Sequence, residues 1–205
     1  MPDAADTVFV VDDDVSVRES LELLIRAVGW RVVAFDSASA FLAYPRPSTA
    51  SCLVLDVALP GVNGLDLQGQ IRERTDMPIV FITGHGDVPT TVRAMKAGAA
   101  EFLTKPFDED VLVSTIRQCL ERSRAVLQEQ AEMRVLLERH ESLTRREREV
   151  MALVVTGLLN KQVGGELGIS EITVKAHRGQ LMRKMQANSL AELVTMAARL
   201  KGTRQ

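Results

Sequence analysis

The 205-residue sequence has few aromatic side chains, only two cysteines and no long apolar run. Aromatic residues make up 4% of the chain, which is ordinary for a soluble α/β protein. Cys52 and Cys119 lie far apart in the sequence and do not have the spacing of metal ligands. This pattern favours buried thiols over a disulfide or a metal-binding thiol pair.

No apolar tract approaches the roughly 18 residues that a membrane-spanning helix needs. The longest tract, "VMALVVTGLL", contains Thr156 and Gly157. The first residues, "MPDAADTVFVVDDD", lack a basic region and their apolar run is too short for a signal peptide. We therefore expect a cytoplasmic protein with no membrane partner.

The formal net charge of −2 conceals an uneven distribution of charge. Residues 1–122 carry 18 acidic and 11 basic side chains, whereas residues 143–205 carry 5 acidic and 11 basic side chains. An acidic segment followed by a basic one indicates two domains, the second with a polyanionic partner. A solvated basic face would produce the same count.

The first hundred residues alternate between short apolar runs and helical patterns. The five runs are "TVFVV", "RVVAF", "CLVLD", "PIVFIT" and "EFLT". Most lack the alternation of apolar and polar residues, as expected for parallel strands that are covered on both faces. This order predicts an α/β fold with a doubly wound, five-stranded parallel sheet of the flavodoxin-like type. Ligands bind to such sheets outside the carboxyl ends of the strands.

The segment from Asp108 to Ser142 contains no proline or glycine and is rich in Glu, Arg, Gln and Leu. It predicts a last helix of the first domain that runs on into a linker helix. The expected division is therefore a first domain at residues 1–122, a helical linker at 123–142 and a second domain at 143–205. Whether the linker forms a coiled coil is left open, because Arg134 interrupts the heptad pattern.

Residues 143–205 predict a small all-α domain. Capping boxes at "TRRE" (144–147) and "SLAE" (189–192) open its first and last helices. Asn160 and Ser170 are the expected N-caps of the two helices between them. Four short helices of this kind form a module with a helix-turn-helix at its centre.

Polar side chains stand at the ends of four of the predicted strands. Asp12 and Asp13 follow the first strand, Asp56 ends the third, Thr83 ends the fourth and Lys105 follows the fifth. Each alone is an ordinary loop or cap residue, but together they predict one pocket for phosphoryl transfer. Packed carboxylates need a hard cation such as Mg²⁺ (or Mn²⁺), which with the lysine would neutralise a phosphoryl group while one carboxylate attacks it.

The motifs "VVDDD", "LVLDVALPG", "ITGHGD" and "KPF" together resemble response-regulator receiver domains. The resemblance covers residues 7 to about 122. It implies that Asp56 is the phosphoacceptor. It also implies that Asp12, Asp13, Asp56 and the backbone carbonyl of Ala58 bind the metal.

The same resemblance gives roles to three further residues. It implies that Thr83 hydrogen-bonds the phosphoryl group, that Lys105 pairs with it, and that Phe102 is an aromatic switch. The alternative reading of Phe102, as a core aromatic of the last strand, is less favoured. Asp14 is expected to face solvent and to start the following helix.

The second domain resembles the DNA-binding domains of the LuxR/NarL type through "SLTRREREV", "NKQVGGELGIS", "TVKAHRGQLMRKM" and "ANSLAELV". With a receiver, this resembles the FixJ/NarL class of two-component transcription factors. Helical spacing directs Val174, Leu181 and Met185 to the core and leaves a basic surface that includes Arg183.

The family positions imply two kinds of contact with DNA. Base contacts are implied for Lys175, Ala176 and Gly179. Because Gly179 has no side chain, fewer direct base contacts are expected than is usual for this type of domain. Phosphate contacts are implied for Thr173, Arg178, Asn160 and Lys161.

The resemblance implies a regulator that receives its phosphoryl group from a sensor histidine kinase. It is expected to form a homodimer through Val88–Ala97 and Glu101–Thr104, to bind double-stranded promoter DNA and to work with RNA polymerase. It would not be an enzyme beyond its own self-phosphorylation and autodephosphorylation.

Two other classes of protein are less consistent with the sequence than a response regulator. An aspartyl-phosphate phosphohydrolase carries a second Asp two residues after its nucleophile, where this chain has Ala58. A phosphorylation-independent binding module would normally lack one of the pocket residues, and all of them are present.

Ala58 occupies a position that is associated with the lifetime of the phosphoryl group in receivers. A small apolar residue leaves the site open to water. The substitution Ala58→Arg is expected to change the autodephosphorylation rate, measured as decay of the phosphorylated protein, and an unchanged decay would contradict this.

Overall fold

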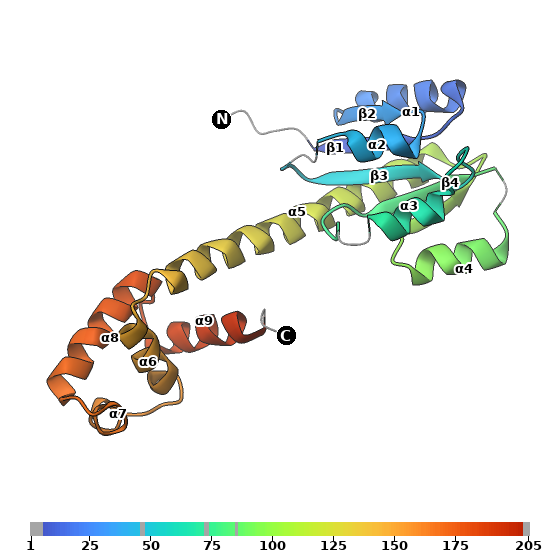
Figure 1. Ribbon diagram of the computed structural model, residues 1–205. Helices are drawn as coiled ribbons and strands as arrows, with labels where there is room; N and C mark the ends of the chain where they lie inside the picture. Colours follow the sequence, from blue (N-terminus) through green and yellow to red (C-terminus); the bar gives the residue numbers. More distant parts are fainter. Residues whose placement is uncertain (1–5, 46–47, 72–73, 85, 203–205) are drawn as a thin grey trace. The chain divides into compact units, whose positions relative to one another are not determined.

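The computed structural model describes residues 6–45, 48–71, 74–84 and 86–202. The chain forms two compact units, one up to Glu129 and one from Gln130 onward. The 33-residue helix α5 (Glu109–Glu141) contributes residues to both (Figure 1). None of the described helices is long and apolar enough to cross a membrane.

The first unit is built on a five-stranded parallel sheet with the order β2-β1-β3-β4-β5 (Figure 1). Its strands are β1 (Thr7–Val11), β2 (Arg31–Phe35), β3 (Ser51–Asp56), β4 (Ile79–Thr83) and β5 (Glu101–Thr104). Every residue of β1, β3 and β4 is buried. The predicted doubly wound parallel sheet is confirmed.

Helices cover both faces of this sheet. They are α1 (Val15–Ala27), α2 (Ala38–Ala43), α3 (Gly64–Gln70), α4 (Val88–Lys96) and the first part of α5. Phe9 and Phe81 belong to the core cluster that α2, α3 and α4 complete, whereas Val10 and Ile82 belong to the cluster that α1 and α5 complete. The second cluster includes the free, buried thiols of Cys52 and Cys119, as expected.

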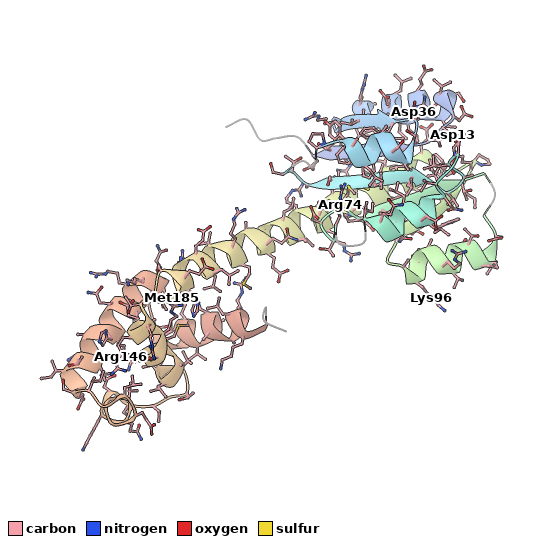
Figure 2. All side chains as sticks on the ribbon, viewed as in Figure 1. Asp13, Asp36, Arg74, Lys96, Arg146 and Met185 are labelled. Atoms are coloured by element: carbon pink, nitrogen blue, oxygen red, sulfur yellow. The ribbon has the colours of Figure 1, made fainter. Side chains whose placement is uncertain are left out.

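The second unit contains α6 (Arg145–Val154), α7 (Asn160–Leu167), α8 (Glu171–Met185) and α9 (Leu190–Gly202). Val174, Leu181 and Met185 are fully buried in its core, which confirms the predicted inner face of α8. Figure 2 labels Met185, the last residue of α8. The end of α5 adds Leu136 to the same core.

Three of the four predicted helix starts are confirmed. Thr144 forms the capping box of α6, and the side chains of Ser170 and Ser189 accept backbone N–H groups in the first turns of α8 and α9. At α9 the predicted capping box is only half as expected, because the Glu192 carboxylate accepts from the N–H of Asn188 and not from that of Ser189. The prediction for Asn160 was wrong, because Leu159 is the N-cap of α7. The Asn160 side-chain oxygen instead accepts a hydrogen bond from Arg178 of α8 at 3.1 Å.

The acidic member of the first capping box is almost fully buried. Glu147 accepts from the backbone N–H of Thr144 and from the Lys184 ammonium, at 2.8 and 2.7 Å. Burial alone would raise the pKa of the Glu147 carboxyl, but these hydrogen bonds outweigh it and hold the pKa below its usual value of 4.5. One carboxylate thus joins the start of α6 to the end of α8.

The substitution Glu147→Gln is expected to lower the free energy of unfolding of the second unit by about 1–3 kcal/mol at pH 7. Because the folded pKa lies below the unfolded one, this contribution is complete above about pH 4.5 and is lost as the pH falls through the folded pKa. Amide hydrogen exchange of α6–α9 measures it. Glu149→Gln, on the same helix but in partly exposed ion pairs, should change stability by less than about 1 kcal/mol. Equal effects of the two substitutions would contradict this account.

Candidate functional site

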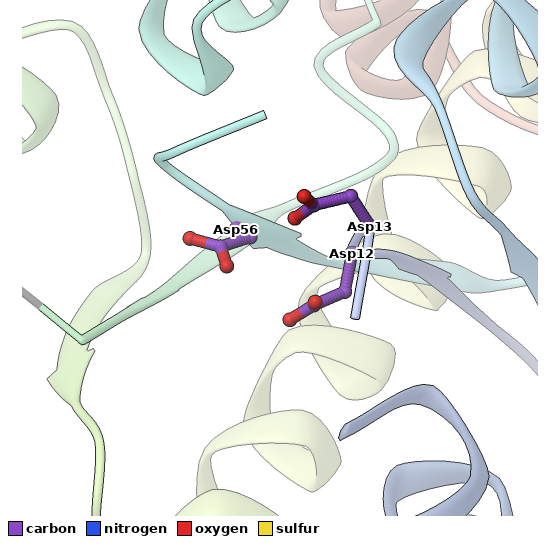
Figure 3. Close-up of side chains that lie close together, drawn as sticks. All are labelled: Asp12, Asp13 and Asp56. Atoms are coloured by element: carbon purple, nitrogen blue, oxygen red, sulfur yellow. The ribbon is translucent and has the colours of Figure 1, made fainter. Parts of the chain in front are cut away.

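Three carboxylates gather at the carboxyl ends of two neighbouring strands. Val11 of β1 lies level with Leu55 of β3, so that Asp12 and Asp56 are the next residues along (Figure 3). One carboxylate oxygen from each of Asp12, Asp13 and Asp56 lies within 4.8 Å of the other two. Asp12 and Asp56 are buried, whereas Asp13 is exposed, so the cluster is open to solvent on one side.

The Lys105 ammonium lies between the two buried carboxylates. Its Nζ is 2.7 Å from Asp12 Oδ2 and 3.0 Å from Asp56 Oδ2. Thr83 pairs with Thr104 across the β4–β5 ladder, and the Lys105 backbone N–H donates to the Thr83 carbonyl at 2.7 Å. This hydrogen bond therefore positions the backbone of Lys105 beside the end of β4.

Backbone donors hold the other carboxylate oxygens. Asp12 Oδ1 accepts from the N–H of Asp14 at 2.9 Å, and Asp56 Oδ1 accepts from the N–H of Ala58 at 3.0 Å. Both carboxylates are thereby fixed in orientation by one backbone donor and one shared ammonium. Fixed geometry of this kind favours a single direction of attack or ligation.

Burial and pairing oppose each other in this cluster. Burial raises the pKa of Asp12, although the hydrogen bond from Lys105 lowers it in part. Burial alone would lower the pKa of Lys105, but its hydrogen bonds to Asp12 and Asp56 raise it above its usual value. The Lys105 side chain is therefore positively charged at neutral pH. The ionised form of Asp12 would be stabilised further by a second positive charge nearby.

The donors in this cluster suit a hard divalent cation. They are all carboxylate oxygens, which Mg²⁺ prefers, and the exposed Asp13 gives an ion a route from solvent. Asp12, Asp13 and Asp56 can therefore hold such an ion. The structure brings together the three side chains that were predicted as metal ligands, and the exposed Ala58 follows two residues after Asp56.

The remaining predicted residues of the first unit lie around this rim. Thr83 is buried at the end of β4, and Phe102 is half-buried on β5, with its ring centroid 6.1 Å from that of Phe81. Asp14 is exposed and its carboxylate accepts from the backbone N–H of Ser16 at 2.8 Å, so it caps α1 as expected.

Three residues support the site without having been predicted. Arg18 donates to the Asp12 backbone carbonyl at 2.7 Å. A Cβ at Gly64 would lie 2.4 Å from the carbonyl oxygen of Asp56, and a Cβ at Gly86 would lie 3.1 Å from the Phe102 ring. The glycines of "GVNG" and "GHGD" are the only features of the sequence that could have indicated these two positions. The sequence does not show that α3 packs against Asp56 or that the β4–α4 loop packs against Phe102.

The predicted DNA-contact residues lie on α7 and α8. Lys175, Ala176, Gly179 and Arg183 are exposed on α8. Thr173 is also exposed, and its hydroxyl lies 2.8 Å from that of Ser170. On α7 Lys161 is exposed, whereas the bond between Asn160 and Arg178 ties the two helices together.

The substitution Gly64→Ala is expected to destabilise the first unit by about 1–3 kcal/mol, because its Cβ would collide with the Asp56 backbone. Gly69→Ala on the same helix meets open space and should be neutral or stabilising by up to about 1 kcal/mol. Denaturant unfolding followed by Trp30 fluorescence compares them. Equal stability of the two variants would refute the close approach.

Comparisons with known proteins cover both units. The response regulator receiver domain family matches residues 8–117, and the bacterial regulatory proteins of the luxR family match residues 141–197. Nodulation protein W of Bradyrhizobium diazoefficiens is 52% identical over 94% of this chain and 86% of its own length. Transcriptional regulatory protein FixJ of the same organism is 40% identical, with 94% of each chain covered.

Solved structures give the same result. The response regulator StyR is 50% identical and matches with a TM-score of 0.87 over 96% of this chain and the whole of that chain. The receiver match alone spans more than half of the sequence. With the five-stranded parallel sheet, the acidic cluster and the helical second unit, these matches show that the chain belongs to the two-component response regulators that join a receiver domain to a LuxR-type DNA-binding domain.

Proposed function

We propose that the protein is a phosphorylation-activated transcription factor that accepts a phosphoryl group on Asp56 from a sensor histidine kinase. The receiver domain implies a kinase partner and the LuxR-type domain implies DNA binding. The observation that carries the proposal is the Lys105 ammonium, bound to both Asp12 and Asp56 beside three clustered carboxylates. We assign residues 1–122 to the receiver, 123–142 to the linker and 143–205 to the DNA-binding domain.

In the transfer step, a carboxylate oxygen of Asp56 attacks phosphorus on the kinase phosphohistidine. The new O–P bond forms as the N–P bond breaks, and the imidazole leaves with its electron pair. Mg²⁺ or Mn²⁺ held by Asp12, Asp13, Asp56 and the Ala58 carbonyl would supply positive charge to the phosphoryl oxygens. Lys105 adds a second positive charge, and the Ala58 N–H keeps Asp56 oriented.

The switch in this proposal involves Thr83 and Phe102. Thr83 would turn its hydroxyl toward the phosphoryl group at the end of β4. A Cβ at Gly86 would contact Phe102, Thr104 and Thr83 side-chain atoms, so this loop packs directly against both switch residues. A shift of Thr83 would thereby change the packing of the Phe102 ring and the surface of β5.

Phosphorylation would then favour a homodimer through α4 and β5. Val88, Val92 and Met95 of α4 are 77%, 43% and 42% exposed, which is a large apolar exposure for one nine-residue helix. A dimer places two DNA-binding units on a two-fold site, which compensates for the weak binding of one small module. RNA polymerase would be the further partner, and the cytoplasm the compartment.

DNA contact in this proposal uses the exposed surface of α7 and α8. Lys175, Ala176 and Gly179 would meet base edges, and Arg183 would extend the basic surface. The phosphate contacts would come from Thr173, Arg178, Asn160 and Lys161. Arg178 also holds Asn160, so its loss would disturb the position of α7 as well.

The substitution Asp56→Asn is expected to abolish labelling by acetyl phosphate in the presence of Mg²⁺, because an amide cannot attack phosphorus. Wild-type protein should label stoichiometrically. Asp14→Asn is the matched control, since Asp14 is an exposed helix cap and Asn caps equally well. This control should label like wild type.

Two other results would overturn the proposal. Rapid release of inorganic phosphate from acetyl phosphate, with no stoichiometric phosphorylated protein accumulating, would identify a phosphohydrolase. An absence of labelling in the folded wild-type protein would identify a phosphorylation-independent binding module.

A further inference from the structure

The exposed face of α8 begins about one turn before the expected base contacts. Lys175, Ala176 and Gly179 are exposed, and the same helical stripe passes through Ile172, three residues before Lys175. The stripe lies on the opposite side of the helix from the buried Val174. Ile172 therefore belongs to the same surface as the expected base contacts.

Ile172 is 82% exposed, the highest value among the large apolar side chains in the described part of the chain. It adds little to the fold, since the start of α8 is held by Ser170, which accepts from the Thr173 N–H at 3.1 Å. An aliphatic side chain that is left in water at the start of a helix gains free energy once a partner covers it.

The neighbours of Ile172 on the stripe are small. Ala176 has only a methyl group, and a Cβ at Gly179 would meet open space. Helical side chains lean toward the N-terminus of their helix, so Ile172 projects toward the end that enters the major groove in helix-turn-helix proteins. Between Ile172 and Gly179 the groove-facing stripe thus presents one cation, Lys175, and one prominent aliphatic group, Ile172.

We propose that Ile172 is a specificity residue that contacts the C5-methyl group of thymine in the operator. The inference rests on the proposed DNA-binding function. In the major groove, thymine alone offers an apolar group, whereas the edges of the other bases offer hydrogen-bond donors and acceptors. An isoleucine pressed against those edges would remove their water without replacing its hydrogen bonds. Ile172 therefore favours thymine and disfavours the other bases at one position of each half-site.

The test starts from operator sequences that the phosphorylated full-length protein selects from random duplexes. Each thymine of the selected half-site is then replaced by uracil, which pairs identically but lacks the methyl group. At one position, uracil should weaken wild-type binding about fivefold to tenfold. Ile172→Ala should weaken binding to the thymine operator by a similar factor and should be insensitive to uracil at that position only.

Two further variants make the measurement specific. Ile172→Val, which keeps most of the aliphatic surface, should retain part of the sensitivity to uracil. Leu159→Ala removes another exposed aliphatic side chain, 70% exposed at the start of α7. This control should keep the full wild-type sensitivity at every thymine.

The outcomes separate the inference from the function on which it rests. If the phosphorylated protein selects no sequence, the proposed function fails and the inference fails with it. If an operator is selected but Ile172→Ala and wild type respond equally to uracil at every position, only the inference is overturned. The same holds if Ile172→Ala binds the operator like wild type and changes transcription alone, which would indicate a protein partner.

Discussion

The ion pairs of Lys105 with Asp12 and Asp56 are the interaction on which the first unit depends. A buried carboxylate without a partner costs several kcal/mol, and this sheet buries two of them side by side. One ammonium satisfies both, at 2.7 and 3.0 Å. The ends of three different strands are thus held together by the charges that also define the site.

Close packing around this cluster also both stabilises the fold and shapes the site. Gly64 lets the first turn of α3 lie against the Asp56 carbonyl, and Gly86 lets the β4–α4 loop lie against Phe102. Neither glycine has a side chain to contribute, yet Gly64 determines how near α3 comes to the Asp56 backbone and Gly86 how near its loop comes to Phe102. Small residues here control geometry, and the charged residues supply the chemistry.

Much of this arrangement could be predicted from the sequence because the signals were local. Apolar runs gave the strands, and carboxylates directly after them gave the pocket, since parallel strands end at one edge. The N-cap of α7 could not be predicted: Asn160 is a good cap by type, but Arg178, distant in sequence, takes its side-chain oxygen. Arg18 and Gly64 were missed for the same reason, because their roles arise from contacts between separate elements.

Gly179 carries a consequence for how such regulators diverge. It lies within α8 with open space around the position of a Cβ, so an alanine there meets no steric barrier and gains about 1 kcal/mol of helix propensity. Fold stability therefore does not oppose mutation at this point on the exposed surface of α8. Residue 179 can vary among related chains while the buried face of the same helix, with Val174, Leu181 and Met185, stays unchanged.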